Sequence, residues 1–189
     1  MQIMIKVARS CLFIASFFLL PPPCHAAGHP KLPYVDQGAC PFECCTYRDW
    51  NTTRAVEIHI EPARKARRAF EIPAGETVHA LTGMVITTKT GVTLIHQPVQ
   101  IGYDKAGHGP LLSLQAGERV YTLHYQGEGF DLFWYKGKVY SDQISVENST
   151  AVQTESRPQT GWWAEIRDKQ GRTGWAEVAD NFDHIDACE

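Results

Sequence analysis

The 189-residue sequence predicts a mostly β protein built on small barrels. Fifteen glycines and eleven prolines interrupt the chain too often for long helices, and they favour short strands joined by turns. Between these breaks apolar and polar residues alternate, which is the period of a half-buried strand. One ten-residue pattern also occurs twice, at 72–81 and 114–123, each time with the turn sequence Ala-Gly-Glu. We therefore expect one complete barrel and part of a second.

The first segment, residues 1–26, is typical of a signal peptide. Lys6 and Arg9 provide a positive start, and an apolar stretch follows that is too short to span a bilayer of about 30 Å. Small residues precede a cleavage site after Ala26 or one residue later. A lipidated Cys24 is the weaker alternative, because three prolines stand directly before it. No later run is apolar enough to span a membrane, so we expect an exported protein, periplasmic or extracellular.

The charge balance excludes one broad class of partner. The formal net charge is −3, whereas a nucleic-acid-binding protein usually carries a basic surplus. Cleavage of the signal peptide removes two basic residues and no acidic residue, which makes the mature chain more acidic. We therefore expect no nucleic-acid partner and no attraction to anionic membrane surfaces.

The next segment, residues 27–54, is expected to be an irregular lead-in held by disulfides. Four cysteines follow the signal peptide, and an even number in an exported chain favours two disulfides. A bond between the adjacent Cys44 and Cys45 would close a strained ring. Two connectivities stay open, namely Cys40–Cys44 with Cys45–Cys188, or Cys40–Cys45 with Cys44–Cys188. The Cys-x-x-x-Cys-Cys spacing lacks the Cys-x-x-Cys of common zinc and redox sites, so no metal is expected.

After the lead-in the alternation becomes regular. Val56, Ile58 and Ile60 point to one side of the chain with polar residues between them, which predicts a strand. Residues 84–95 are typical of a hairpin that turns at Lys-Thr-Gly. Together with the first copy of the repeated pattern, these elements make residues 55–96 a partial barrel.

The second half of the chain, residues 97–189, is expected to form the complete barrel. Residues 130–140 predict another strand and a turn at Lys-Gly. Residues 143–160 are polar and are expected to be a long inserted loop. The clearest hairpin is the last one, at 161–178, in which Asp-Lys-Gln-Gly-Arg forms the turn.

This last hairpin resembles that of a known family. Trp-Trp-x-x-Ile-Arg followed by Asp-x-x-Gly-Arg-x-Gly-Trp, at 162–175, resembles the closing hairpin of bacterial SH3-like (SH3b) domains. The Ala-Gly-Glu turns are similar to the segment after the first strand of these domains. The resemblance implies small SH3-like barrels that act as binding modules, often for cell-wall peptidoglycan peptide or glycan, with no chemistry of their own. Residues 38–48 are also similar to the lead-in of small exported proteobacterial proteins of unknown function.

Common catalytic motifs do not occur in the sequence. Neither the Gly-x-Ser-x-Gly of serine hydrolases nor the His-Glu-x-x-His of metalloproteases is found, and a cysteine nucleophile would need a free thiol. The histidines are scattered singly, and His59, His79 and His124 fit predicted strands as ordinary strand residues. We therefore expect a protein that is not an enzyme and uses no cofactor. A small envelope hydrolase is the weakest alternative.

Aromatic residues near the end of the chain are the best candidates for a binding site. Trp162 lies on the expected core face of the last hairpin, which leaves the opposite face for a ligand. An exposed tryptophan there could stack on a sugar or clamp a peptide, bordered by charged residues. The alternative is a protein-facing role in an envelope complex, through an exposed sheet edge. The candidate ligand-binding residues are Trp163, Trp175, Glu165, Arg167 and Tyr135.

Overall fold

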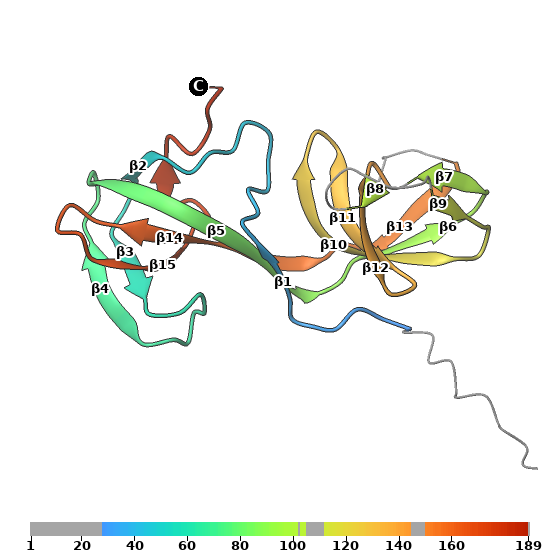
Figure 1. Cartoon of the computed structure of the whole chain (residues 1–189), viewed down its shortest axis with the longest axis horizontal. Helices are drawn as coiled ribbons and strands as arrows, with labels where there is room; N and C mark the ends of the chain where they lie inside the picture. The colour runs from blue at the N-terminus through green and yellow to red at the C-terminus, as the bar shows by residue number, and fades with distance from the viewer. Residues whose placement is uncertain (1–27, 102, 105–111, 145–149, 189) are drawn as a thin grey trace, which may run out of the picture.

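The structure is a computed structural model that describes residues 28–188 except 102, 105–111 and 145–149. The predicted signal peptide, residues 1–26, lies outside the described residues. The described residues form sixteen strands, β1 to β16, which confirms the prediction of a mostly β protein. None of them belongs to a helix that could cross a membrane. Figure 1 shows the strands gathered into two lobes, A and B, with the long strand β5 reaching from one toward the other.

Lobe A is a curled antiparallel sheet assembled from two separate stretches of the chain. Its strands lie in the order β16-β2-β5-β14-β15-β3-β4. Alternate residues of these strands point to one side and form a single core around the fully buried Trp50, Ile58 and Ile166. The strands are β2 (Asp49–Thr52), β3 (Val56–His59), β4 (Arg68–Ile72), β5 (Thr77–Lys89), β14 (Gln159–Arg167), β15 (Thr173–Glu177) and β16 (Phe182–Asp183).

Lobe B is formed by the chain between β5 and β14. Its main sheet has the order β13-β6-β10-β11-β12-β8, and β7 and β9 form a separate pair. Its core contains the fully buried Ile95, Leu114 and Phe133. The strands are β6 (Val92–Ile95), β7 (Val99–Ile101), β8 (Tyr103–Asp104), β9 (Leu112–Leu114), β10 (Arg119–Gly127), β11 (Phe130–Tyr135), β12 (Lys138–Asp142) and β13 (Val152–Ser156).

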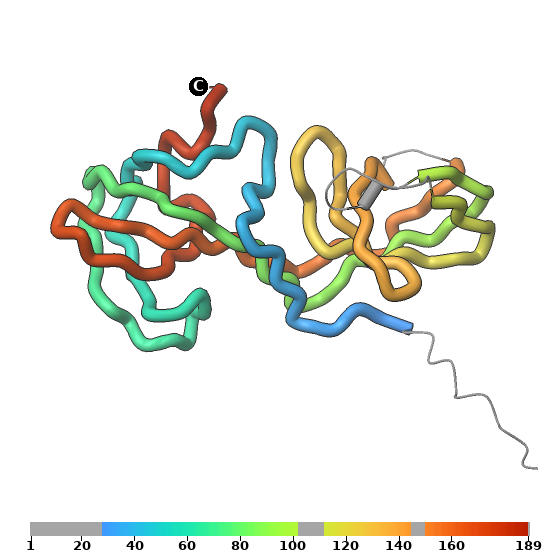
Figure 2. Tube along the Cα trace, in the orientation of Figure 1, coloured from blue at the N-terminus to red at the C-terminus, as the bar shows by residue number. Residues whose placement is uncertain are grey.

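In sequence, lobe B is therefore an insertion between two strands of lobe A. β14 pairs with β5 along its whole length, although all of lobe B separates the two strands in sequence. Figure 2 shows the chain leaving lobe A through β5 and returning along β14. This insertion corrects the expected division into 55–96 and 97–189, because the last hairpin completes the sheet of the first region. It also corrects the hairpin expected at 84–95, since β5 and β6 belong to different lobes.

The polar segment 143–160 contains strand residues rather than one long loop. β13 pairs with β6 in this segment, and β14 begins at Gln159. β13 is an edge strand of lobe B and most of its side chains are exposed or only partly buried. Such a strand carries few of the apolar residues by which a strand is recognised in a sequence. Residues 145–149 lie outside the described residues.

The two lobes pair their strands in the same order. The first strand of lobe A, β2, lies between β16 and β5, and the first strand of lobe B, β6, lies between β13 and β10. Each long strand, β5 or β10, also pairs with the first strand of a hairpin, β14–β15 or β11–β12. Each hairpin continues to a further strand, β3 in lobe A and β8 in lobe B.

The turns that precede the two long strands also correspond. Gly75 and Gly117 adopt left-handed backbone angles, with φ of 77° and 86°, which glycine adopts without the penalty of a Cβ. The Gly75 N–H donates to the carbonyl of Thr52 at the end of β2, and the Gly117 N–H donates to that of Ile95 at the end of β6. The repeated Ala-Gly-Glu sequence is thus bonded in the same manner in both lobes.

A β-bulge occurs at the corresponding place in each long strand. The register shifts by one residue at Leu81 between β5 and β14, and at Leu123 between β10 and β11. A bulge leaves one extra residue on one strand and increases its bend. Beside each bulge, the hairpin places a fully buried residue in its lobe's core, Ile166 in lobe A and Phe133 in lobe B.

An N-terminal strap, residues 28–40, joins the two lobes. Its strand β1 (Tyr34–Gln37) pairs with residues 84–87 of β5, which lie near the boundary of lobe B. Tyr34 packs against a cluster on the outer face of lobe B, meaning the face of β10, β11 and β12 opposite the lobe's core. Figure 1 shows the strap in blue, passing from beneath lobe B toward lobe A.

Two disulfides hold the segment that follows the strap. They are Cys40–Cys45 and Cys44–Cys188, which confirms the expected two disulfides and selects the second of the two open connectivities. The C-terminal tail runs beside the lead-in, where the Ala187 N–H donates to the carbonyl of Cys44. The lead-in is thus attached to the end of the chain by a covalent bond and by backbone hydrogen bonds.

Candidate functional site

The last hairpin of lobe A brings four of the candidate positions to one face. In the β14–β15 register Trp163 lies opposite Glu177, and Glu165 lies opposite Trp175. Because side chains alternate along a strand, these residues share the outer face of lobe A, together with Arg167. Trp162 packs against the core on the opposite face, as expected, with its Nε1 3.0 Å from the Tyr47 hydroxyl oxygen.

Trp163 is covered, contrary to the expectation that it is exposed. Only 4% of its surface is accessible, and the ring of His59 lies edge-on to its ring at 5.9 Å between centroids. The loop between β3 and β4 extends over this end of the face, where the Arg64 guanidinium donates to both oxygens of Glu177 at 2.7 and 2.6 Å. This loop is remote in sequence, so alternation along β14 could not reveal it.

On the outer face of the hairpin, Trp175 is therefore the more accessible tryptophan. It is half-buried, and it lies between Glu165 of β14 and His59 of β3 in the same row across the sheet. Glu165 is half-buried and Arg167 is exposed. The row thus presents one aromatic surface beside a carboxylate, with a guanidinium two positions further along β14. Such a surface can stack on a flat or apolar group and bind polar groups at its border.

Tyr135 lies away from this face. It is in the core of lobe B with 6% of its surface accessible, and its pKa is raised by burial and by the carboxylate of Glu118. Burial alone would raise the pKa of Glu118 as well. Hydrogen bonds from the Gln115 N–H, Lys136 and Tyr135 outweigh that effect and lower the pKa of Glu118 to about 2. Tyr135 thus belongs to a structural hydrogen-bond network, not to the hairpin face.

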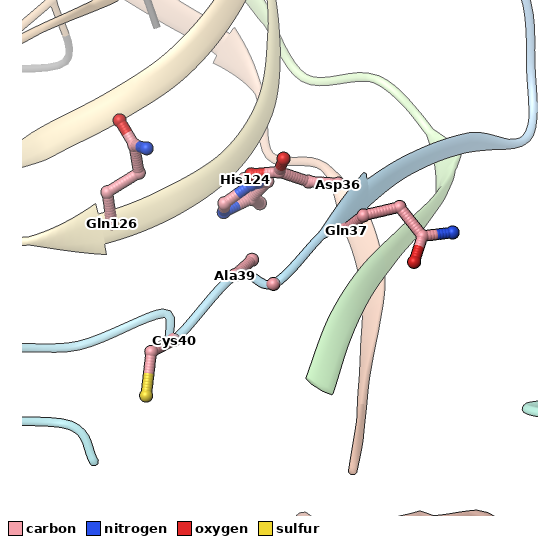
Figure 3. Close-up of a pocket in the computed structure, with 7 residues that line it drawn as sticks. Asp36, Gln37, Ala39, Cys40, His124 and Gln126 are labelled. Atoms are coloured by element: carbon pink, nitrogen blue, oxygen red, sulfur yellow. Dashed lines mark hydrogen bonds and ion pairs between the residues drawn. The ribbon is translucent and has the colours of Figure 1, made fainter. Parts of the chain in front are cut away.

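A second candidate site is a cavity of about 240 Å³ between the strap and lobe B. Residues 36–40 of the strap line it, together with His124 and Gln126 of β10. Figure 3 labels Asp36 of the strap and His124 of β10 at this cavity. The Oδ2 atom of Asp36 lies 2.9 Å from the ring Nε2 of His124. The other ring nitrogen lies 2.7 Å from the carbonyl oxygen of Tyr125. Both nitrogens of His124 thus face hydrogen-bond acceptors inside the protein.

The Asp36–His124 pair fastens the strap to lobe B. A general base needs a ring nitrogen directed at its substrate, and both nitrogens of His124 are occupied by protein groups. The two side chains are only 2% and 3% accessible. His124 does lie in a strand, as predicted, but nothing local in the sequence connects it with Asp36, because the two residues are 88 positions apart.

One group of potential metal ligands occurs among the described residues. Cys44, Asp186 and Cys188 place one ligand atom each within 4.8 Å of one another. The two sulfurs are bonded to each other, and a disulfide sulfur lacks the thiolate charge that binds metals. In the disulfide form this group is a covalent connection between the lead-in and the tail.

Comparisons with protein-family models, with curated proteins and with solved structures found no match for this chain.

Proposed function

We propose that this protein is an exported, non-catalytic binding module made of two SH3-like units, and that it binds cell-wall peptidoglycan through the outer face of lobe A. The observation that carries the proposal is the row Glu165–Trp175–His59, in which a half-buried indole lies between a half-buried carboxylate and the largely covered imidazole of His59 on the outer face of lobe A. Aromatic rings with adjacent hydrogen-bonding groups are suited to the sugars and short peptides of a cell wall.

The correspondence of the two lobes supports the two-unit part of the proposal. Both pair their strands in the same order, both enter the long strand through a left-handed glycine turn, and both place a bulge in that strand. Lobe B is the complete unit, because its strands follow one another in the chain without interruption. Lobe A is the unit divided by the insertion, and its closing hairpin carries the SH3b-like sequence.

The disulfides support export, since disulfides persist in oxidising compartments and are rare in the cytosol. The arrangement of His124 and Asp36 supports a non-catalytic role, because the pair is directed at protein groups. A protein-facing role in an envelope complex is the second proposal, and the exposed Leu81 and Arg167 of lobe A support it.

Co-sedimentation with purified peptidoglycan sacculi tests the wall proposal. We expect the mature protein to pellet with sacculi and Trp175→Ala to lose most of this binding. The matched control is Tyr125→Ala, which removes an aromatic side chain that is 48% accessible in lobe B. Both variants must first show wild-type circular dichroism. Absence of pelleting for the wild type across a range of salt, or equal pelleting of the two variants, contradicts the proposal.

A further inference from the structure

The strap covers part of the outer face of lobe B. The corresponding part of the outer face of lobe A includes the accessible Leu81. Leu123, Leu132 and Trp134 form a cluster on the outer face of lobe B, and Tyr34 of the strap packs against it. The His29 ring lies 4.6 Å from that of Tyr121 on the same face. An extended segment of this chain thus covers the outer side of the β10–β11 pair.

Pairing registers identify the same positions on lobe A. Tyr121 faces Trp134 two residues before the bulge at Leu123, and His79 faces Arg167 two residues before the bulge at Leu81. On the other side of the bulge His124 faces Leu132, and Thr82 faces Glu165. The residues of lobe A that correspond to the strap-covered positions are thus His79, Leu81, Thr82, Glu165 and Arg167.

The exposure of these positions differs sharply between the lobes. Leu123 is fully buried in the cluster against which Tyr34 of the strap packs, whereas the corresponding Leu81 is 37% accessible. Arg167 is exposed where Trp134 is buried, and the side chain of His79 is 44% accessible. Lobe A therefore has an exposed leucine and an exposed guanidinium along a track that, on lobe B, an extended peptide fills.

We propose that this track is a docking surface for an extended segment of a partner protein, which binds lobe A as the strap binds lobe B. The strap indicates that the segment is extended and carries an apolar side chain, since Tyr34 packs on the cluster that contains Leu123, the counterpart of Leu81. Asp36 of the strap pairs with His124, whose counterpart on lobe A is Thr82, so the acidic side chain of the partner is inferred from charge complementarity to the exposed Arg167 instead. On lobe A, the segment presents an apolar side chain to Leu81 and an acidic side chain to Arg167. The proposal does not depend on wall binding, which is centred on the indole of Trp175, although the row around Trp175 and the track share Glu165.

A library of random decapeptides displayed on phage and selected against the intact mature protein tests this docking. We expect enriched sequences that combine an apolar residue with a nearby acidic residue. Their synthetic peptides should bind Leu81→Asp at least ten-fold more weakly by fluorescence anisotropy. Arg167→Glu should weaken the acidic peptides in the same way, which is the expected effect of a reversed charge.

Ile60→Asp is the matched control, because Ile60 is an exposed apolar residue of lobe A with 43% of its surface accessible, outside the track. It should bind the peptides as the wild type does. Failure to enrich any sequence, or peptides that bind Leu81→Asp and Ile60→Asp equally, overturns the proposal. So does a wild-type dimer in sedimentation equilibrium that Leu81→Asp converts to a monomer, since the occupant would then be a second copy of the chain. None of these outcomes changes the expected co-sedimentation with sacculi, so either proposal can be rejected without rejecting the other.

Discussion

Lobes A and B have the same strand order but differ in how they are closed. Lobe B is continuous in sequence, and its outer face is covered by the strap through Tyr34 and Asp36. Lobe A is divided by the insertion, and its lead-in is joined to Cys188 by a disulfide. On its outer face Trp163 is covered by the loop between β3 and β4, whereas Leu81 is accessible. Our proposals assign the two outer faces different roles, since that of lobe B holds the strap and that of lobe A binds a ligand.

The largest expected effects come from removing the core of each lobe. Trp50→Ala removes a fully buried indole from lobe A and should cost about 3–5 kcal/mol, as should Phe133→Ala in lobe B. Because lobe B is continuous, it should keep its amide protection in Trp50→Ala. Lobe A should persist in Phe133→Ala, because lengthening a loop costs little entropy. Hydrogen exchange measured by mass spectrometry checks both, and simultaneous loss of protection in both lobes would show that they form one cooperative unit.

The disulfides should differ in their contribution to lobe A. Replacing Cys44 and Cys188 by serine opens a loop with a sequence separation of 144, and the chain-entropy model assigns such a loop about 4–5 kcal/mol. Replacing Cys40 and Cys45 opens a separation of 5, for which the same model assigns about 2 kcal/mol. Urea denaturation without reductant measures both. Equal losses would contradict the assignment of the longer loop as the main covalent constraint.

The two bulge leucines provide the most direct comparison of the lobes. Leu123→Ala removes a fully buried side chain and should cost about 3 kcal/mol, whereas Leu81→Ala should cost less than about 0.5 kcal/mol because Leu81 is exposed. Thermal and urea denaturation of the two variants test this. A similar cost for both substitutions would mean that the face of lobe A is not open in solution.

The smallest expected effect concerns the glutamates of the two Ala-Gly-Glu turns. Glu118→Gln should cost about 1 kcal/mol at pH 7, because Glu118 accepts a backbone N–H and the Lys136 ammonium. Glu76→Gln should cost about 0.5 kcal/mol or less, because Glu76 has only an exposed ion pair with Lys169. Urea denaturation at constant ionic strength measures both losses of stability.

Glu118 should also give lobe B a specific pH dependence. Its folded-state pKa is lowered to about 2, so its contribution to stability is present above the pKa of the unfolded chain and is lost as the pH falls toward 2. The difference in stability between the wild type and Glu118→Gln should therefore shrink when the pH is lowered from about 5 to about 2. A difference that is constant over this range would contradict the lowered pKa.

Local features of this fold were predictable from the sequence. The last hairpin, the Lys136-Gly137 turn and the two Ala-Gly-Glu turns depend on neighbouring residues, and they form as expected. Alternation also placed Trp162 on the core side correctly. Each of these features is determined by strand periodicity or by the backbone freedom of glycine, which a short segment of sequence reveals.

Features that depend on distant pairing were not predictable. β5 has no partner nearby in sequence, so its pattern favoured a hairpin at 84–95, although its partner β14 lies beyond lobe B. The burial of Trp163 depends on the loop that carries Arg64, and the fastening of the strap depends on Asp36 meeting His124. In each case the decisive contact joins residues that no periodicity or motif connects.

The long separation of Cys188 from the other three cysteines affects the order in which the disulfides form. Cys188 follows Cys44 by a sequence separation of 144, which takes about 7–29 s at synthesis rates of about 5–20 residues per second. During that interval Cys40 can pair with either of two adjacent thiols, and only the bond to Cys45 leaves Cys44 available for the tail. A chain that first forms a bond between Cys40 and Cys44 therefore needs thiol–disulfide exchange to reach the native pairing.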